Sequence, residues 1–399
     1  MIKINTFKLK LIAVMVPLLF TASAQVFAAD DAQTLKIYVD QETKQIFSEP
    51  GPNRVKMGDF KPATAADTKS IKVELNKKGL GFKTEDGQFK FGFGGRLHTD
   101  ATYHSNDKLQ KGGDRIEAND GTEIRRARIV FKGTLWKDFN FYTEADFGDN
   151  SVGMKDLFLN YTGWDFADIT VGHQKQNISM EVQESSNDMM FTERSLIYSF
   201  TQVLFDRAIG LHLKKSDKNW SAQVGVYGDA MTANKSNSNK GSGKADEGFG
   251  ASTRVTFAPI NTPNEVIHLG GFAGVRTPNG KNKFNDVGSS FFYETTHMSN
   301  LNLTDTGAIA GIDDAKMVGL ELAAMSGPFS VQSEYAKVKV QREKNLSSLD
   351  FDAFYVQAGW TLTGESRSYK GSDGEFKRLK PKSKFQMGKP GFGALELAA

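Results

Sequence analysis

The chain has 399 residues, of which 50 are basic, 47 are acidic and none is cysteine. Three of the basic residues lie in the first ten positions, so the rest carries 47 charges of each sign, a balance that argues against a nucleic-acid partner. The lack of cysteine excludes a disulfide scaffold, and 39% hydrophobic residues with 39 glycines and 30 phenylalanines is typical of strands that are apolar on one face only.

The N-terminus predicts an export signal over residues 1–28. Lysines precede an apolar run at 11–20, and small residues lead to a cleavage site before Ala29, although cleavage after Ala24 fits nearly as well. The apolar run is too short to cross a bilayer, and no later stretch approaches the roughly 20 apolar residues that a membrane helix needs. The protein is therefore expected to leave the cytoplasm, and membrane insertion would require a β-barrel.

Residues 29–78 are polar and weakly patterned, and proline and glycine interrupt them at 49–52 and at Pro62. We interpret them as an N-terminal periplasmic extension, although a mobile linker fits equally well. Residues 79–399 are interpreted as a transmembrane β-barrel that is incomplete at its C-terminus.

Two neighbouring segments show strict alternation of apolar and polar residues. In 139–147 the odd positions are apolar or small and the even positions are polar or charged, and 126–135 follows the same period. The link at 136–138 predicts a hairpin. The apolar face would meet either a second sheet or lipid, and in a membrane barrel the polar face would line water. That polar face would carry Arg126, Arg128, Lys132, Glu144 and Asp146.

Further alternating segments follow to the end of the chain. They lie at 88–103, 155–161, 167–171, 209–213, 220–226, 249–257, 267–276, 317–325, 329–338 and 351–362. Short connections at 136–138, 216–219 and 326–328 alternate with long ones at 106–121, 175–205, 230–247 and 277–314. Bacterial outer-membrane barrels have this asymmetry between periplasmic turns and extracellular loops, so the pattern favours a barrel over a sandwich.

Several motifs together resemble the phosphate-selective porin O and P family. They are 91–97 (FGFGGRL), 124–128 (IRRAR), 155–163 (KDLFLNYTG), 185–188 (SSND), 192–196 (TERSL) and 362–367 (LTGESR). The resemblance runs from about Gly79 to the last residue. It implies an antiparallel sixteen-stranded outer-membrane barrel, usually a trimer, in which one long loop folds into the lumen and basic residues carry anions through.

The resemblance also implies pore residues. Arg96, Arg125 and Arg126 match basic residues of the family's pore, and Arg194 matches the arginine of the inward-folded loop, here 175–205. Guanidinium groups are always charged and bind phosphate oxygens in pairs, and a narrow water column concentrates their field. Strand parity adds Arg128, Lys132 and Arg254 to the lumen, with Glu144, Asp146 and Asp156 as counter-charges. Alternatively, these arginines pair with the carboxylates and have a structural role.

The sequence departs from the family at two places. Where phosphate-selective members carry closely spaced arginines, residues 289–297 contain no arginine and one glutamate, so we expect modest anion preference. The chain also stops at 393–399, within what looks like a strand. About thirteen of the sixteen implied strands are present, and we expect the sequence to be truncated, because an unpaired edge in lipid is costly.

No catalytic motif, cofactor site or metal-binding pattern was found, and the six histidines are scattered. The sequence therefore predicts an outer-membrane porin, not an enzyme, for passive diffusion of small solutes, including anions such as phosphate. Its expected partners are outer-membrane lipid, small anions or other small solutes, and further copies in a homotrimer. Two alternatives stay open, a barrel enzyme of the lipase or protease kind and a secreted β-sandwich adhesin.

Overall fold

The computed structural model describes residues 35–43, 45–60, 71–76, 79–105, 108–111, 114–231, 247–278, 290–298, 301–388 and 390–399. The predicted signal, residues 1–28, lies outside them. The chain divides into two units, Met1–Ser70 and Ile71–Ala399. In the described part of the first unit, β1 (Leu35–Asp40) lies between β2 (Ile46–Phe47) and β3 (Arg54–Phe60) in an antiparallel sheet. The predicted division at residues 28 and 78 stays a prediction.

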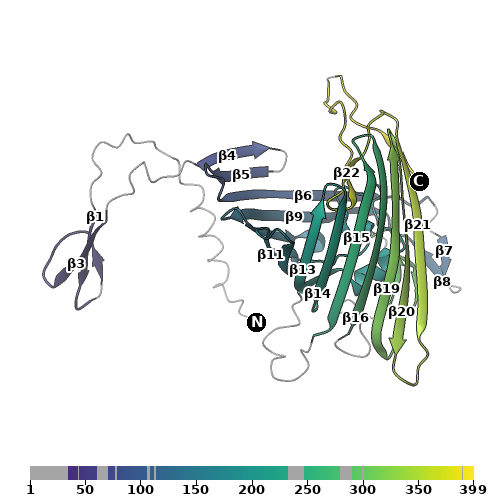
Figure 1. The fold of residues 1–399 in the computed structure, drawn as a ribbon, viewed down its shortest axis with the longest axis horizontal. Coiled ribbons are helices and arrows are strands. Elements are labelled where there is room, and N and C mark those ends of the chain that lie inside the picture. Colours follow the sequence, from purple (N-terminus) through teal and green to yellow (C-terminus); the bar gives the residue numbers. More distant parts are fainter. Residues whose placement is uncertain are drawn as a thin grey trace, which may run out of the picture. The chain divides into compact units, whose positions relative to one another are not determined.

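The second unit is built on one antiparallel sheet of fifteen strands (Figure 1). Each strand pairs with the next one along the chain, and the edge strands β4 and β24 do not pair with each other. The strands are β4 (Ile71–Asn76), β5 (Gly79–Thr84), β6 (Lys90–Thr102), β9 (Gly121–Leu135), β10 (Phe139–Asp146), β11 (Gly153–Tyr161), β12 (Asp168–Lys175), β13 (Arg207–Asp217), β14 (Trp220–Tyr227), β15 (Phe249–Asn261), β16 (Glu265–Thr277), β19 (Ile312–Ser326), β20 (Phe329–Arg342), β21 (Leu349–Thr361) and β24 (Glu396–Ala398). The thirteen strands from β6 to β24 correspond to those predicted, the strands β4 and β5 of the same sheet were not predicted, and the antiparallel all-β architecture is confirmed.

Smaller elements lie outside this sheet. Three short antiparallel pairs join β7 (Lys108–Lys111) to β8 (Asp114–Glu117), β17 (Phe292–Glu294) to β18 (Asn302–Asp305) and β22 (Ser368–Lys370) to β23 (Glu375–Lys377). The helices in the described residues are the 3₁₀ turn η2 (Gly148–Asn150), α2 (Met180–Gln183) and α3 (Tyr198–Leu204). No helix in the described part of the chain is long and apolar enough to cross a membrane.

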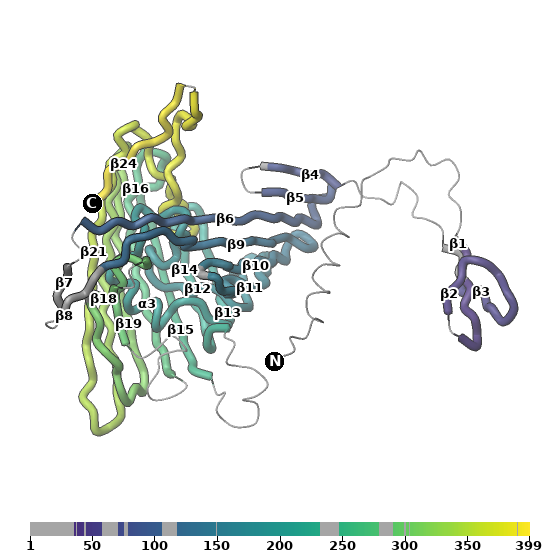
Figure 2. Tube along the Cα trace, turned by 180° about the vertical axis from the view of Figure 1, so that it is seen from behind, coloured from purple at the N-terminus to yellow at the C-terminus, as the bar shows by residue number. Residues whose placement is uncertain are grey.

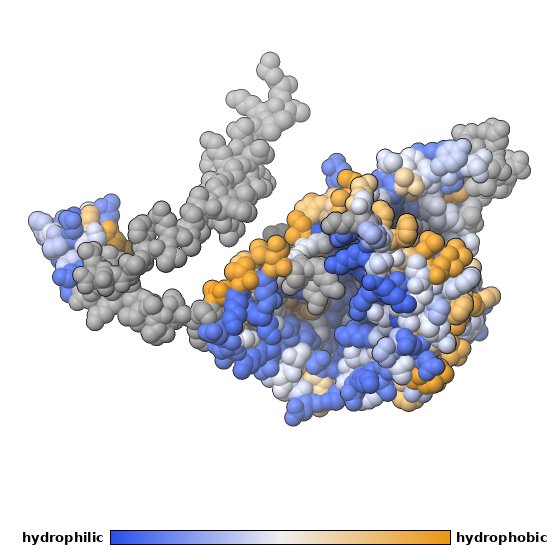
Figure 3. All heavy atoms as spheres, turned by 90° about the horizontal axis from the view of Figure 1, so that it is seen from above, coloured by the Kyte–Doolittle hydropathy of each residue, from blue (hydrophilic) through white to orange (hydrophobic). Residues whose placement is uncertain are grey.

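The two faces of the large sheet differ as the alternation predicts. On β19 the side chains of Val318, Leu320 and Leu322 are 56–64% exposed, whereas the intervening Met317 and Glu321 are completely buried on the hollow side. Figure 3 shows orange, hydrophobic side chains along the outer margins and blue, hydrophilic ones toward the hollow in the middle. An exposed apolar outer face is stable where lipid covers it.

Aromatic side chains mark one end of the sheet. All four tryptophans, at positions 136, 164, 220 and 360, lie in or beside the short turns. Neighbouring aromatic rings contact them there, with ring centroids 5.0 Å apart for Trp164 and Phe166 and 5.6 Å apart for Trp360 and Phe329. Tryptophan and tyrosine gather at the membrane–water interface, so this end, called the turn end below, marks one membrane boundary.

Two segments fold into the hollow side of the sheet from opposite ends; α3 of the first is labelled in Figure 2 and β22 of the second in Figure 1. Residues 176–206, called the luminal loop, connect β12 to β13 and include α2 and α3. Residues 368–377, called the turn-side hairpin, comprise β22 and β23 and follow β21, whose last residue contacts the turn before β20 (Thr361 N to Pro328 O, 2.9 Å). The inward-folded loop predicted at 175–205 is confirmed, whereas the hairpin was not predicted.

Candidate pore lining

The luminal loop has an apolar side that fixes its position. Ile178, Phe200 and Leu204 are buried in one cluster with Phe272 of β16 and Val338 of β20. The loop therefore covers the inner face of the strands from β16 to β21 and leaves its polar side toward the strands from β6 to β13.

A carboxylate on β20 also holds the luminal loop in place. Glu334 of β20 accepts the backbone N–H groups of Met180 and Glu181, at 3.0 and 2.8 Å. These donors belong to the first turn of α2 and have no partner within the helix, so the carboxylate satisfies them.

A cavity of about 580 Å³ lies between the polar side of the loop and the opposite wall. Two further cavities, of about 850 and 190 Å³, share lining residues with it, Arg96 and Tyr142 with the larger and Arg128 and Arg207 with the smaller. The lining of the 580 Å³ cavity includes seven basic side chains, Arg96, Arg126, Arg128, Lys175, Arg194, Arg207 and Lys214, and four acidic ones, Glu144, Asp156, Asp373 and Glu375. The three cavities form a chain of polar spaces with an excess of positive charge.

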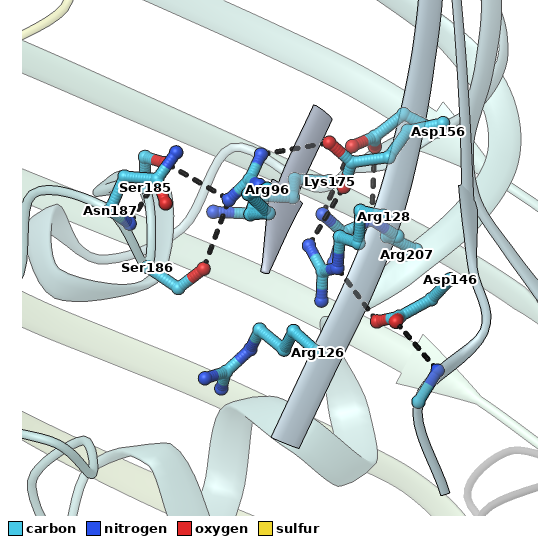
Figure 4. Close-up of polar contacts among 12 residues, drawn as sticks. Arg96, Arg126, Arg128, Asp146, Asp156, Lys175, Ser185, Ser186, Asn187 and Arg207 are labelled. Atoms are coloured by element: carbon cyan, nitrogen blue, oxygen red, sulfur yellow. Dashed lines mark hydrogen bonds and ion pairs between the residues drawn. The ribbon is translucent and has the colours of Figure 1, made fainter. Parts of the chain in front are cut away.

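Part of this charge is neutralised by ion pairs between side chains of β6, β9 and β10 (Figure 4). Glu144 accepts hydrogen bonds from Arg96 Nη2 at 2.8 Å and from Arg128 Nη1 at 2.7 Å. Arg128 also donates through Nε to Asp146, at 2.7 Å. Arg96 extends toward the luminal loop, where it donates to Ser186 at 3.1 Å. Two guanidinium groups thus share one buried carboxylate. Arg96 and Arg128 therefore form the structural ion pairs that the sequence analysis gave as the alternative to anion binding.

Asp156 has a partner that the sequence analysis missed. Arg207 donates to both oxygens of Asp156, through Nε and Nη2, each at 3.0 Å. Strict alternation with the exposed Ile209 and Leu211 would put Arg207 on the lipid side. However, it is the first residue of β13, where the luminal loop joins the strand and alternation does not yet apply. Its position directly after an inward-folded loop was the available signal.

Three lumen cations, Arg126, Lys132 and Lys155, have neither a carboxylate nor a backbone carbonyl as a partner among the described residues, whereas Lys175 and Arg194 donate to backbone carbonyls. Arg126 has only a long contact with His98, 3.5 Å from Nη1 to Nδ1, and Figure 4 draws it without an ion pair. No ion pair or hydrogen bond of the side chains of Lys132 or Lys155 was found within the described ranges. Arg126 lines both the 580 and the 190 Å³ cavities, whereas Lys132 lines the 850 Å³ cavity and Lys155 the 190 Å³ cavity.

A β-bulge in β9 explains why two consecutive arginines reach the lumen. Arg126 pairs with His98, and Glu123 pairs with Asp100, so β9 uses three residue steps where β6 uses two. The extra residue changes the alternation. Arg125 consequently lies with Arg126 on the lumen side, and its Nη2 is 3.4 Å from Glu193 Oε2 of the luminal loop.

A second bulge, in β11, adds Lys155. Glu144 and Ala145 of β10 pair with Asp156 and Met154, so Lys155 is the extra residue between them. It lines the 190 Å³ cavity together with Arg125. Each bulge therefore adds one cation to the lumen side beyond those that strict alternation places there.

The two remaining predicted pore arginines bind backbone carbonyls. Arg194 lines the 580 Å³ cavity, but it donates to the carbonyl of Glu181 and to that of Glu184 at 2.9 Å, and so ties the luminal loop together. Arg254 is completely buried and pairs with both oxygens of Glu321 at 2.8 Å.

Arg254 also holds the turn-side hairpin. It donates to the carbonyls of Asp373 and Gly374, at 2.9 and 2.7 Å. The hairpin covers its guanidinium, so this predicted lumen cation does not reach the open cavity.

The luminal loop and the turn-side hairpin each carry carboxyl groups with a shifted pKa. Burial raises the pKa of Glu184 to about 8 against the opposing effect of Arg367, whose Nη2 is 3.8 Å away. Burial also raises the pKa of Glu181. On the hairpin, burial alone would raise the pKa of Asp373. The ammonium of Lys214, 2.8 Å from its carboxylate, outweighs this effect, and the pKa falls to about 2. Asp373 is therefore a permanent anion, whereas Glu184 binds a proton near neutral pH.

A sheet that is hydrophobic outside and charged inside, with aromatic rings at its turn end and an inward-folded loop, defines a porin of the bacterial outer membrane. The model of the phosphate-selective porin O and P family matches residues 91–399. The chain belongs to this family and is an outer-membrane channel protein of Gram-negative type.

Individual relatives are distant. Porin O of Pseudomonas aeruginosa is 24% identical over 339 residues, which cover 78% of this chain and 73% of that protein. An uncharacterized protein of Caulobacter vibrioides is 29% identical over 281 residues, 69% of this chain and 54% of that protein. Among solved structures, a loop-deletion mutant of OmpT, an outer membrane protein of Vibrio cholerae, is 14% identical, with a TM-score of 0.42 over 69% of this chain and 78% of that one.

Proposed function

We propose that the channel prefers small anions modestly and conducts them past Arg126. Three lumen cations without a carboxylate partner, Arg126, Lys132 and Lys155, line the chain of polar cavities, and this observation supports the proposal. Low-dielectric walls concentrate the field of such charges and enrich anions in the water between them. The paired arginines, Arg96, Arg128 and Arg207, contribute less because carboxylates compensate their charge.

The preference is modest because residues 291–298, which belong to the long connection 277–314, include no arginine. Residues 291–298 lie against the luminal loop, where the Phe292 carbonyl accepts from Gln202 at 3.0 Å and the Tyr293 hydroxyl donates to the Arg194 carbonyl at 3.1 Å. This segment contributes Glu294 and no guanidinium. Phosphate should therefore block chloride current only at millimolar concentration. Half-block at micromolar phosphate would contradict a modest preference.

The test is the reversal potential of the protein in a planar bilayer under a KCl gradient. Wild type should show a chloride-selective sign, and Arg126→Gln should move the potential toward zero. Lys337→Gln removes an equal charge from an exposed position outside the cavities and should leave it unchanged. A cation-selective wild type, or equal shifts in both variants, would overturn the proposal.

We further propose that the protein works as a homotrimer in outer-membrane lipid and has no enzymatic activity beside the channel. The family resemblance supports the trimer, and the exposed apolar outer face supports the contact with lipid. Chemical cross-linking in outer-membrane vesicles should give a product of three chains, and a product of one chain alone would exclude the trimer.

A further inference from the structure

Two aromatic side chains face the polar cavities from neighbouring strands. Tyr142 of β10 and Phe158 of β11 are cross-strand partners, and their half-buried rings are stacked with centroids 5.5 Å apart and planes 10° apart. Both line the 580 Å³ cavity. A hydrated inorganic anion gains nothing from the ring of Phe158, which has no polar atom.

A cation without a partner stands beside this pair. Lys132 of β9 is the cross-strand partner of Tyr142 on its other side, so Lys132, Tyr142 and Phe158 form one row across three strands. Side chains directly opposite each other have Cβ atoms roughly 5 Å apart. Tyr142 lines both the 580 and the 850 Å³ cavities, so a solute that passes from one to the other crosses this row.

We propose that this row is a binding site for aromatic carboxylates. The aromatic ring of the solute stacks on Phe158 and Tyr142, and its carboxylate binds the ammonium of Lys132 or the guanidinium of Arg126. A cavity of about 580 Å³ is in the range of small-molecule sites and holds a single-ring anion. The inference rests on the proposed anion channel and adds a chemical class of solute to it.

Stacking between the two rings also stabilises the sheet, and cross-strand aromatic pairs are common for that reason alone. The distinguishing property is recognition of a solute ring. Aromatic contacts contribute beyond the area that they bury, so benzoate should bind more tightly than cyclohexanecarboxylate, which has the same charge and a similar size.

The experiment measures block of chloride current through the protein in planar bilayers by benzoate and by cyclohexanecarboxylate. Benzoate should reach half-block at a concentration about fivefold lower, from the usual strength of aromatic contacts. Phe158→Leu should remove this difference. Phe141→Leu, a change on the outer face of β10, should preserve the difference between the two acids. Phe158→Trp keeps an aromatic ring at this position and should preserve the difference too, and it replaces the leucine variant if that variant fails to insert.

Equal half-block concentrations for the two acids in wild type, or a benzoate preference that persists in Phe158→Leu, would overturn the inference. The proposed anion preference is tested separately. A wild type that selects chloride over potassium but does not distinguish the two acids would support the anion preference and overturn the aromatic-carboxylate site. A cation-selective wild type would overturn both proposals.

Discussion

Arg126 on one inner wall of the sheet and two arginines on the opposite wall are in different states, although Arg96, Arg128 and Arg207 of the first wall are also ion-paired. On the wall from β6 to β13, Arg126 faces the cavities with no carboxylate partner among the described residues. On the wall from β15 to β20, Arg254 and Arg276 are completely buried, Arg254 with Glu321 and Arg276 with Asp229. The first wall presents charge to water, and the second uses charge to hold segments in place.

The difference shows that an inward position on a strand does not make a residue part of the pore. Parity places Arg126 and Arg254 on the same face of the sheet, but the turn-side hairpin covers Arg254, whereas no segment in the described part of the chain covers Arg126 in this way. What packs on a strand decides whether its charge is available to a solute.

The largest expected effect is on the covered wall. Arg254→Met leaves Glu321 buried beside His268 without its guanidinium partner, and breaking such a pair costs about 3–5 kcal/mol. The variant should lose the heat-modifiable, SDS-resistant form on gels, or unfold at a clearly lower temperature in detergent. The double variant Arg254→Met with Glu321→Gln should recover part of the loss. Wild-type stability of the single variant would show that the pair does not hold this wall.

A smaller loss of stability should separate two arginines on the open wall. Arg128→Met removes the hydrogen bonds to Glu144 and Asp146 and should lower the free energy of unfolding by about 2 kcal/mol. Arg126→Met breaks no ion pair and should stay within about 0.5 kcal/mol of wild type. Denaturant unfolding in detergent measures both. Equal losses would mean that Arg126 also has a structural role.

Much of this fold could be predicted from the sequence, because alternation records which face meets lipid. The exposed residues of β19 and the inward Glu144 follow directly from the period of two. The family motifs located the inward-folded loop. Alternation and motifs are both properties of short sequence segments, so they can be recognised without knowing what packs against the strand.

The availability of individual charges could not be predicted in the same way. One extra residue in β9 and one in β11 change the alternation, so parity alone did not place Arg125 or Lys155 in the lumen. The coverage of Arg254 depends on a hairpin more than a hundred residues away in the chain. Bulges and long-range contacts depend on tertiary structure, which no single segment specifies.

A pH change should loosen the contact between loop and hairpin. Because Glu184 has a raised pKa of about 8 in the buried site, the seated loop is favoured when the carboxyl is protonated, and this stabilisation is lost as pH rises through about 8. Between pH 6 and pH 9 the current of wild type should become noisier or larger. Glu184→Gln should remove the step, and Glu265→Gln at the exposed turn end should keep it. The same pH profile in all three proteins would exclude Glu184 as the cause.

The smallest effect concerns salt, and it sharpens the contrast between a solvated and a buried charge. Arg126 acts on ions through pore water, where the screening length falls from about 10 Å at 0.1 M salt to about 3 Å at 1 M. The shift in reversal potential that Arg126→Gln causes should therefore be clear at 0.1 M KCl and small at 1 M. Arg254 binds Glu321 where both are completely buried, and screening is much weaker there, so the stability lost in Arg254→Met should change little over the same range. If the effect of Arg126→Gln were equally large at 1 M KCl, Arg126 would bind ions by direct contact, and the anion preference would come from a discrete site instead of the field of the open wall.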